Sequence, residues 1–284
     1  MVMRLAAVAL AGFVAQQSQV VISVSARSLQ PGELVLLTIT TPEPAGAVHM
    51  RAFDRDWAAF PVDGRVWRAL VGIDLDVAPG DHDVNVRVDA SAGVRRATET
   101  LTVSPKTFPT RRLTVDEAFV NPPAAVRPRI DREQAELERL WLSSSGPPRW
   151  NGPFIRPVPH EANSAFGTRS VFNDEPRSPH GGADFSSPAG TPVKAPAAGR
   201  VLLARDLYYT GSTVMIDHGA GLISLFAHLS SIDVKPDAEV AAGAPLGKVG
   251  STGRVTGAHL HWTTRVGGAR VDPLSVLHVL SQPQ

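Results

Sequence analysis

Cysteine is absent from the sequence of 284 residues. Its absence excludes disulfide bonds, cysteine-ligated zinc, iron–sulfur clusters and catalysis by a thiol. The chain also has no large surplus of charge of one sign. It contains 28 lysines and arginines and 27 aspartates and glutamates, for a formal net charge of +1. We therefore expect no nucleic-acid partner and no anionic membrane surface as a partner. Hydrophobic residues make up 43% of the chain, which is enough to bury sizeable cores.

A transmembrane span, which takes about 20 apolar residues, is not found either. The N-terminus instead carries Arg4 followed by the uncharged segment Leu5–Val14, a pattern typical of a secretory signal peptide. We expect residues 1–17 to be cleaved on export, which leaves no stable membrane insertion. A buried first strand and an uncleaved anchor are the alternatives. The cleavage site is not defined, because Phe13 at position −3 from Ala15 fits a cleavage motif poorly.

Residues 18–105 have short segments of alternating apolar and polar residues, separated by turn signals such as Pro31-Gly32 and Pro79-Gly80. Such a series predicts an Ig-like β-sandwich domain. The expected strands are Val20–Val24, Leu34–Thr40, Val66–Val71, Asp83–Asp89 and Thr98–Val103. His49 and His82 are isolated there, and we interpret both as surface or turn residues.

Residues 106–149 form a proline-rich linker that contains one predicted helix. Asp131 is expected to cap this helix, with Gln134 three residues later as in a capping box, and the helix should end near Leu142. The helix either packs between the domains or is mobile; the sequence leaves both open.

Residues 150–284 again alternate between β-branched or apolar segments and glycine-containing loops, which predicts a second, antiparallel β domain. Helical periodicity is weak before Pro273–Leu280. The expected strands are Thr191–Lys194, Gly199–Ala204, Thr213–Asp217, Leu222–His228, Pro245–Val249 and His259–Arg265.

His180 and Asp184 are four residues apart, with Gly181 and Gly182 between them. Four residues of straight strand would separate the two Cα atoms by about 13 Å, too far for ligands of one zinc ion. We therefore expect the chain to bend at the glycines and to aim both side chains at one point. By itself, this spacing is found more often in an unrelated surface turn.

His259 and His261 lie two residues apart in a predicted strand, so period-2 geometry puts both on one face. Either or both could ligate a metal, and a solvated pair beside Trp262 is the alternative. His228 ends an apolar strand, where a single histidine is more often a hydrogen-bonded core residue.

Together these residues indicate a metal site more specifically than any one of them does. Two histidines and one aspartate form a site of charge +1 with zinc, and they leave a fourth position for water, as catalytic zinc requires. A neighbouring imidazole could then take a proton from that water and later help the amine leave.

The order of the motifs resembles the lysostaphin/LytM-type zinc endopeptidases of bacterial cell walls. The matching segments are Phe166–Arg169, His180–Phe185, Gly190–Ala195, Gly199–Val201, His218–Gly219, Phe226–Leu229, Gly247–Gly253 and Thr256–Trp262. The N-terminal sandwich is similar, more weakly, to a β-domain that precedes this peptidase in some exported bacterial members.

The resemblance implies an antiparallel β-sheet fold with the site in a groove. It implies Zn²⁺ held by His180, Asp184 and His261, with His228 and His259 contacting the water and the tetrahedral intermediate. The implied substrates, and partners, are peptidoglycan peptides, cut in the stem or in the cross-bridge. His218 matches a turn of the family, and we interpret it as structural.

Two positions depart from the family. Phe226 stands where many relatives have tyrosine, and Thr263 stands where acidic residues are frequent. We expect neither to touch a metal ligand, so activity should survive.

The leading hypothesis is an exported metallo-endopeptidase, in the periplasm or associated with the cell envelope, or alternatively secreted. The alternatives are a non-catalytic wall-binding protein or activator of another hydrolase, and a zinc-bound module that only recognises glycan. The sandwich could position the substrate, bind a partner or cover the groove. The bond cleaved and the oligomeric state stay open.

Overall fold

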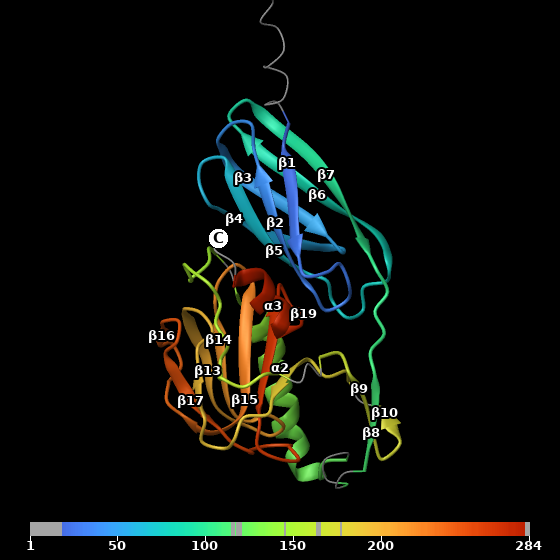
Figure 1. The fold of residues 1–284 in the computed structure, drawn as a ribbon, viewed down its shortest axis with the longest axis vertical. Helices are drawn as coiled ribbons and strands as arrows, with labels where there is room; N and C mark the ends of the chain where they lie inside the picture. Colours follow the sequence, from blue (N-terminus) through green and yellow to red (C-terminus); the bar gives the residue numbers. More distant parts are fainter. Residues whose placement is uncertain are drawn as a thin grey trace, which may run out of the picture.

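The computed structural model describes residues 19–114, 117, 121–144, 146–162, 166–176 and 178–281. The expected signal peptide, residues 1–17, lies outside the described residues. Most regular structure is β, in two large antiparallel sheet systems and one small sheet, which confirms the predicted fold class (Figure 1). Among the described residues, no helix is both long and apolar enough to cross a membrane.

The N-terminal part has seven strands in the order β1-β2-β5-β4-β3-β6-β7. They are β1 (Val21–Ala26), β2 (Leu34–Thr40), β3 (Ala45–Ala52), β4 (Arg55–Pro61), β5 (Val66–Gly72), β6 (Gly80–Ala90) and β7 (Gly93–Val103). Residues 55–58 of β4 pair with β3, whereas residues 59–61 pair with β5, so β4 joins the two sheets of the sandwich. Strands β3 and β4 were not predicted, because they contain several alanines, a residue type depleted in strands.

The C-terminal part is built on a nine-stranded antiparallel sheet in which β11, β18, β15, β14, β13 and β16 follow one another. Its strands are β11 (Gly182–Phe185), β12 (Pro192–Lys194), β13 (Gly199–Leu207), β14 (Gly211–Asp217), β15 (Leu222–Ile232), β16 (Glu239–Val240), β17 (Pro245–Val249), β18 (Leu260–Val266) and β19 (Ala269–Val271). All six strands predicted for this part are present. Pro245–Val249 has the predicted ends, and each of the other five is shifted at one or both ends.

A third, small sheet joins the linker to the C-terminal part. Strand β8 (Thr110–Leu113) pairs in parallel with β9 (Arg169–Phe172), and β10 (Glu175–Pro176) pairs antiparallel with β9. Figure 1 shows a long extended connection that runs from the sandwich down to β8, beside β9 and β10. The sequence pattern of the linker predicts no strand, so β8 is a finding of the structure.

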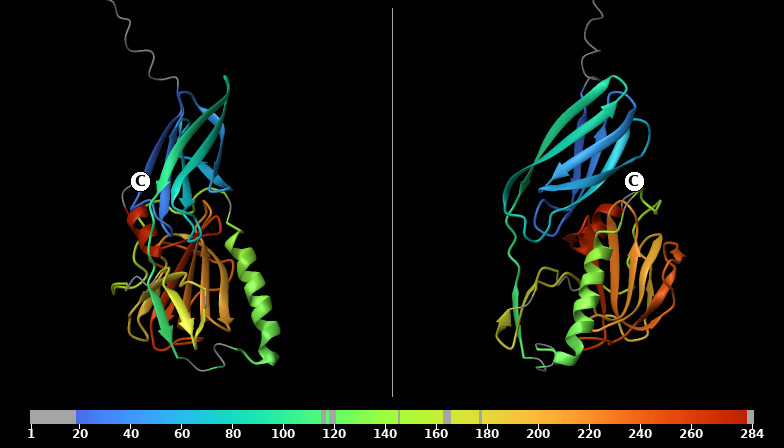
Figure 2. Two further views of the ribbon diagram at one scale, coloured as in Figure 1. Left: turned by 90° about the vertical axis from the view of Figure 1, so that its right-hand side faces the viewer. Right: turned by 180° about the vertical axis from the view of Figure 1, so that it is seen from behind.

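The linker helix α2 (Arg127–Trp141) follows a 3-10 turn, η1 (Ala124–Val126). It begins at Arg127, so the prediction of Asp131 as its cap is wrong. Proline in the first turn is the local reason, because its fixed φ suits a helix start and its missing N–H is not needed there. Buried Trp141 packs with Met215 and Ile223, and α2 therefore lies along one face of the nine-stranded sheet (Figure 2).

The last helix, α3 (Pro273–Leu280), is capped by Asp272, whose carboxylate accepts a hydrogen bond from the backbone N–H of Leu274. Its buried residues Val276 and Val279 share one hydrophobic core with the sandwich. The sandwich therefore packs directly on α3 (Figure 1).

Ion pairs reinforce this contact. Arg27 lies 2.7 Å from the carboxylates of both Glu33 and Asp272, and Arg270 pairs with Asp74 and Asp76. Both clusters join the sandwich to the chain segment that enters α3, so charge as well as apolar packing sets the position of the sandwich.

Candidate metal centre

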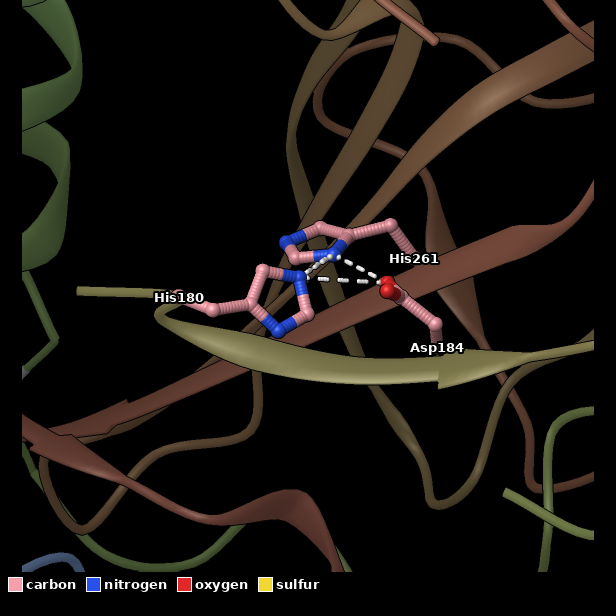
Figure 3. A group of neighbouring side chains, drawn as sticks. All are labelled: His180, Asp184 and His261. Carbon is pink, nitrogen blue, oxygen red and sulfur yellow. Dashed lines mark hydrogen bonds and ion pairs between the residues drawn. The ribbon is translucent and has the colours of Figure 1, made fainter. Parts of the chain in front are cut away.

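Three side chains with metal-binding atoms converge at the start of β11. Antiparallel pairing of β11 with β18 places Asp184 directly opposite His261. His180 lies two residues before β11, and its ring turns toward the other two side chains (Figure 3). The His180/Asp184 spacing predicted that these two side chains meet, whereas the choice of His261 over His259 as the third proposed ligand came from the family resemblance.

The donor atoms have the separation that a tetrahedral ion requires. His180 Nε2 lies 3.0 Å from His261 Nδ1 and 3.2 Å from Asp184 Oδ1, and His261 Nδ1 lies 2.8 Å from Asp184 Oδ1. Bonds of about 2 Å in a tetrahedral zinc site put neighbouring donors roughly 3.3 Å apart. The three residues therefore fit zinc with a small outward adjustment of the donors.

Gly182 allows the His261 ring to lie close to the backbone of β11, for a reason that the sequence did not reveal. Neither Gly181 nor Gly182 is among the glycines with positive φ, so a left-handed backbone is not what requires glycine here. A Cβ on Gly182 would lie 2.4 Å from the carbonyl oxygen of Trp262 and 2.7 Å from Cε1 of His261. Glycine is needed here because the histidine ring packs on its Cα.

His228 and His259 lie beside the cluster. The ring of His228 is centred 5.0 Å from that of His259 and 5.9 Å from that of His261. His259 Nε2 is 3.7 Å from Asp184 Oδ1. His228 has a φ of 62°, an unfavourable left-handed conformation for a side chain of its size, and such strain clusters at functional sites.

The hydrogen bonds of these two histidines define where their protons are. Nδ1 of His228 lies 2.9 Å from the carbonyl oxygen of Thr252, and Nδ1 of His259 lies 2.9 Å from that of Gly257. A carbonyl oxygen only accepts, so each Nδ1 carries a hydrogen and each neutral ring keeps Nε2 as an acceptor. Burial, together with the nearby His261, lowers the pKa of His228 to about 3, so the ring is neutral near pH 7.

The cluster holds Asp184 as an anion. Burial works against the charge, but hydrogen bonds from His180 and His261 lower the pKa of Asp184 well below its ordinary value. Burial also lowers the pKa of His261, partly opposed by its hydrogen bond to Asp184. Both shifts favour the protonation states that bind a divalent metal, an ionised Asp184 and a neutral His261.

Thr263 touches a proposed ligand, contrary to expectation. Its Oγ1 lies 2.8 Å from His261 Nε2, the ring nitrogen on the side away from the cluster. The two residues are neighbours on one face of β18, because side chains alternate along a strand. Phe226 is fully buried, with its ring stacked on Trp262 at a centroid distance of 6.1 Å.

His218 has no part in this cluster. It is fully buried, with Nδ1 2.9 Å from the carbonyl oxygen of Ala198 and Nε2 3.0 Å from Ser224 Oγ. Both ring nitrogens are satisfied within the fold, which agrees with the structural interpretation.

An antiparallel β fold with a His-Asp-His cluster and two adjacent histidines has the chemistry of a metal-dependent hydrolase. The model of peptidase family M23 matches residues 178–273, a range that includes all five of these residues. A crystal structure of a peptidase M23 from Pseudomonas aeruginosa is 35% identical, covers 90% of this chain and 97% of that chain, and has a TM-score of 0.67. The chain belongs to peptidase family M23, which confirms the resemblance to the lysostaphin/LytM type.

Two curated relatives are similar over a shorter range. The DD-carboxypeptidase/endopeptidase Mpg of Neisseria meningitidis is 43% identical over 97 residues, and the peptidoglycan DD-endopeptidase ShyA of Vibrio cholerae is 43% identical over 96 residues. Each match covers 34% of this chain and 22% of the relative. The chain thus spans about a fifth of the length of the curated relatives it matches.

Proposed function

We propose that this protein is a zinc-dependent endopeptidase that hydrolyses peptide bonds in the stem peptides or cross-links of peptidoglycan. The observation that carries the proposal is the convergence of His180, Asp184 and His261, beside two further histidines, in a chain of peptidase family M23. The names of its relatives, which include a peptidoglycan DD-endopeptidase, support the substrate class.

In this proposal His180, Asp184 and His261 hold the zinc ion. A bound zinc ion polarises a carbonyl group and lowers the pKa of water to about 7. The chain's part is to keep Asp184 ionised and to hold the rings of His180 and His261 with one nitrogen each toward the cluster. The fixed hydrogen bond at the far nitrogen of His261 orients its ring, as is usual for metal-bound histidine.

His228 and His259 are proposed to handle protons and to stabilise charge. Nδ1 of His228 donates to the carbonyl oxygen of Thr252, so Nε2 is the nitrogen of the neutral ring that is left to accept a proton from the attacking water. It can later return that proton to the amine that leaves. His259, with Nε2 3.7 Å from Asp184 Oδ1, lies on the same side and is proposed to contact the tetrahedral intermediate there.

The test is hydrolysis of purified cross-linked muropeptides, followed by mass spectrometry, with and without added zinc. His261→Ala and His228→Ala should both abolish cleavage, but only His261→Ala should lower zinc content. His49→Ala, at an exposed position of the sandwich, is the control and should cleave normally. A zinc-loaded wild type that leaves every muropeptide intact would refute the proposal and favour a non-catalytic wall-binding protein or activator.

We also propose that the protein acts in the cell envelope after export, in the periplasm or outside the cell. Arg4 and the uncharged segment Leu5–Val14 support this location, since they have the pattern of a signal peptide. Cell fractionation, together with the N-terminal sequence of the mature protein, tests it. Full-length protein in the cytoplasmic fraction would refute it.

A further inference from the structure

The three proposed ligands are not supported equally by the sheet. Asp184 and His261 belong to β11 and β18 and face each other in the ladder. His180 precedes β11, so its backbone needs support from elsewhere. That support comes from the segment before β9: Gly167 N donates to the carbonyl oxygen of His180 at 2.7 Å, and His180 N donates to that of Thr168 at 2.9 Å.

This segment is in turn held by the linker. Arg169 N donates a hydrogen bond of 2.9 Å to the carbonyl oxygen of Pro109, and the parallel pairing of β8 with β9 continues from there. The ring of Phe108 packs against Gly167, where an added Cβ would be only 2.1 Å from ring atom Cε1. Backbone pairing and one aromatic contact therefore clamp residues 167–172 from the linker side.

The sandwich holds the same segment directly. The buried ring of Phe166 packs on Gly32, where an added Cβ would be 2.4 Å from its Cε1 atom. Gly32 lies between β1 and β2, and its carbonyl oxygen accepts a hydrogen bond of 2.7 Å from Asp272 N. Residues 166 and 167 are thus fixed on two sides, by the sandwich and by the linker.

The start of the linker is attached firmly to the sandwich. Ser104 N donates to the carbonyl oxygen of Leu29 at 2.8 Å, and Lys106 Nζ lies 3.2 Å from Glu33. Glu33 is only 1% exposed, so this ion pair is shielded from solvent better than a surface pair. Lys106 Nζ also stands 5.3 Å from the centre of the Phe108 ring, which links the ion pair to the clamp.

We propose that Phe108 and strand β8 are positioning elements for His180, so that the N-terminal sandwich and its linker contribute to metal affinity. The inference rests on the proposed metal site and deepens it. A ligand held in its bound position loses less conformational freedom when the metal binds. On this basis the sandwich supports the metal site. Removing the sandwich lowers metal affinity, instead of exposing an active site that the sandwich had covered.

The test compares Phe108→Ala, Phe108→Leu and the wild type as full-length proteins, with zinc affinity measured by competition with a chelator. Partners of metal ligands typically change affinity 10- to 100-fold, and for this less direct support we expect about a tenfold loss in Phe108→Ala. Phe108→Leu keeps apolar volume over Gly167 and should recover most of the loss. Phe60→Ala is the control, because Phe60 is a half-buried aromatic residue of the sandwich on β4.

Amide hydrogen exchange of the metal-free proteins gives a readout that needs neither zinc nor activity. The amides of Gly167, His180 and Arg169 should exchange faster in Phe108→Ala than in the wild type, and should be unchanged in Phe60→Ala. Gly167→Ala forces the Phe108 ring away and should lower zinc affinity as Phe108→Ala does. If Phe108→Ala fails to fold, Gly167→Ala and Phe108→Leu still test the proposal.

The outcomes separate this inference from the proposed function. A wild type that binds zinc tightly, with Phe108→Ala and Gly167→Ala within twofold of its affinity and with unchanged exchange at His180, would overturn the positioning role alone. A wild type that binds no zinc would instead overturn the metal site on which the inference rests.

Discussion

Replacing Thr263 by valine removes one hydroxyl group and keeps the shape of the side chain. That hydroxyl is 2.8 Å from Nε2 of His261, and Thr263 is only 9% exposed. When Nδ1 of His261 binds zinc, the ring's proton must be on Nε2, and the threonine oxygen then accepts it. Valine leaves this N–H without a partner in a site that water reaches poorly.

The magnitude follows from the cost of an unpaired buried donor, about 1–3 kcal/mol. The metal makes the imidazole N–H more positive, so the hydrogen bond is stronger with zinc than without it, and most of the cost falls on the bound state. Since about 1.4 kcal/mol corresponds to a factor of ten, we expect zinc affinity to fall about 10- to 100-fold. A carboxylate acceptor, as in Thr263→Glu, should raise affinity.

Zinc affinity is measured by chelator competition at constant pH. Thr264→Val is the matched control, because it lies next on β18, is fully buried, and donates its hydroxyl to the carbonyl oxygen of Val271 at 2.7 Å. It should lose stability but keep zinc affinity. If Thr263→Val binds zinc within twofold of the wild type, the assigned role of the Thr263 hydroxyl is refuted.

Three further predictions concern the fold around the site. Gly182→Ala should lose zinc binding and about 1–3 kcal/mol of stability, because its Cβ would overlap His261. Gly181→Ala is the control, because the space at its Cβ is open, and it should leave denaturant unfolding and zinc titration nearly unchanged. Burial lowers the pKa of His218 to about 4 from 6.5, so stability is full above pH 6.5 and falls by about 3 kcal/mol as the pH drops to 4. His218→Gln should have a flatter pH dependence in unfolding experiments on the metal-free protein, and parallel curves would contradict the assignment. Zinc at 100 times its dissociation constant should stabilise the wild type by about 2.7 kcal/mol and leave His261→Ala unchanged in thermal unfolding.

Much of the fold follows from local patterns. Strand β6 keeps Val84, Val86 and Val88 in the core and turns the residues between them outward, as its alternation predicts. The linker helix was expected in the right region, but its start was wrong because Asp131 resembles a cap while a proline in the first turn sets the beginning. Strands β3 and β4 were missed because alanine-rich segments carry little local β signal.

The candidate site, like the fold, can be predicted from the sequence only in part. Its residue types and order, and the shared face of His259 and His261, can be read from the chain. The contact of Thr263 with His261 was missed, although the two positions are also two apart on a strand. An alternation pattern tells which side chains share a face, but not which hydroxyl comes within hydrogen-bond distance of which nitrogen.

The sequence by itself determined a mainly β protein, a peptidase motif set, and the histidines and aspartate able to bind a metal. Only the tertiary structure decided that β11 pairs with β18 to bring Asp184 opposite His261, and that the linker strand β8 pairs with β9 beside His180. The physical reason is distance along the chain. Local preference sets φ, ψ and alternation within a few residues, whereas strand pairing across about 60 to 80 residues depends on how whole sheets bury their surfaces together.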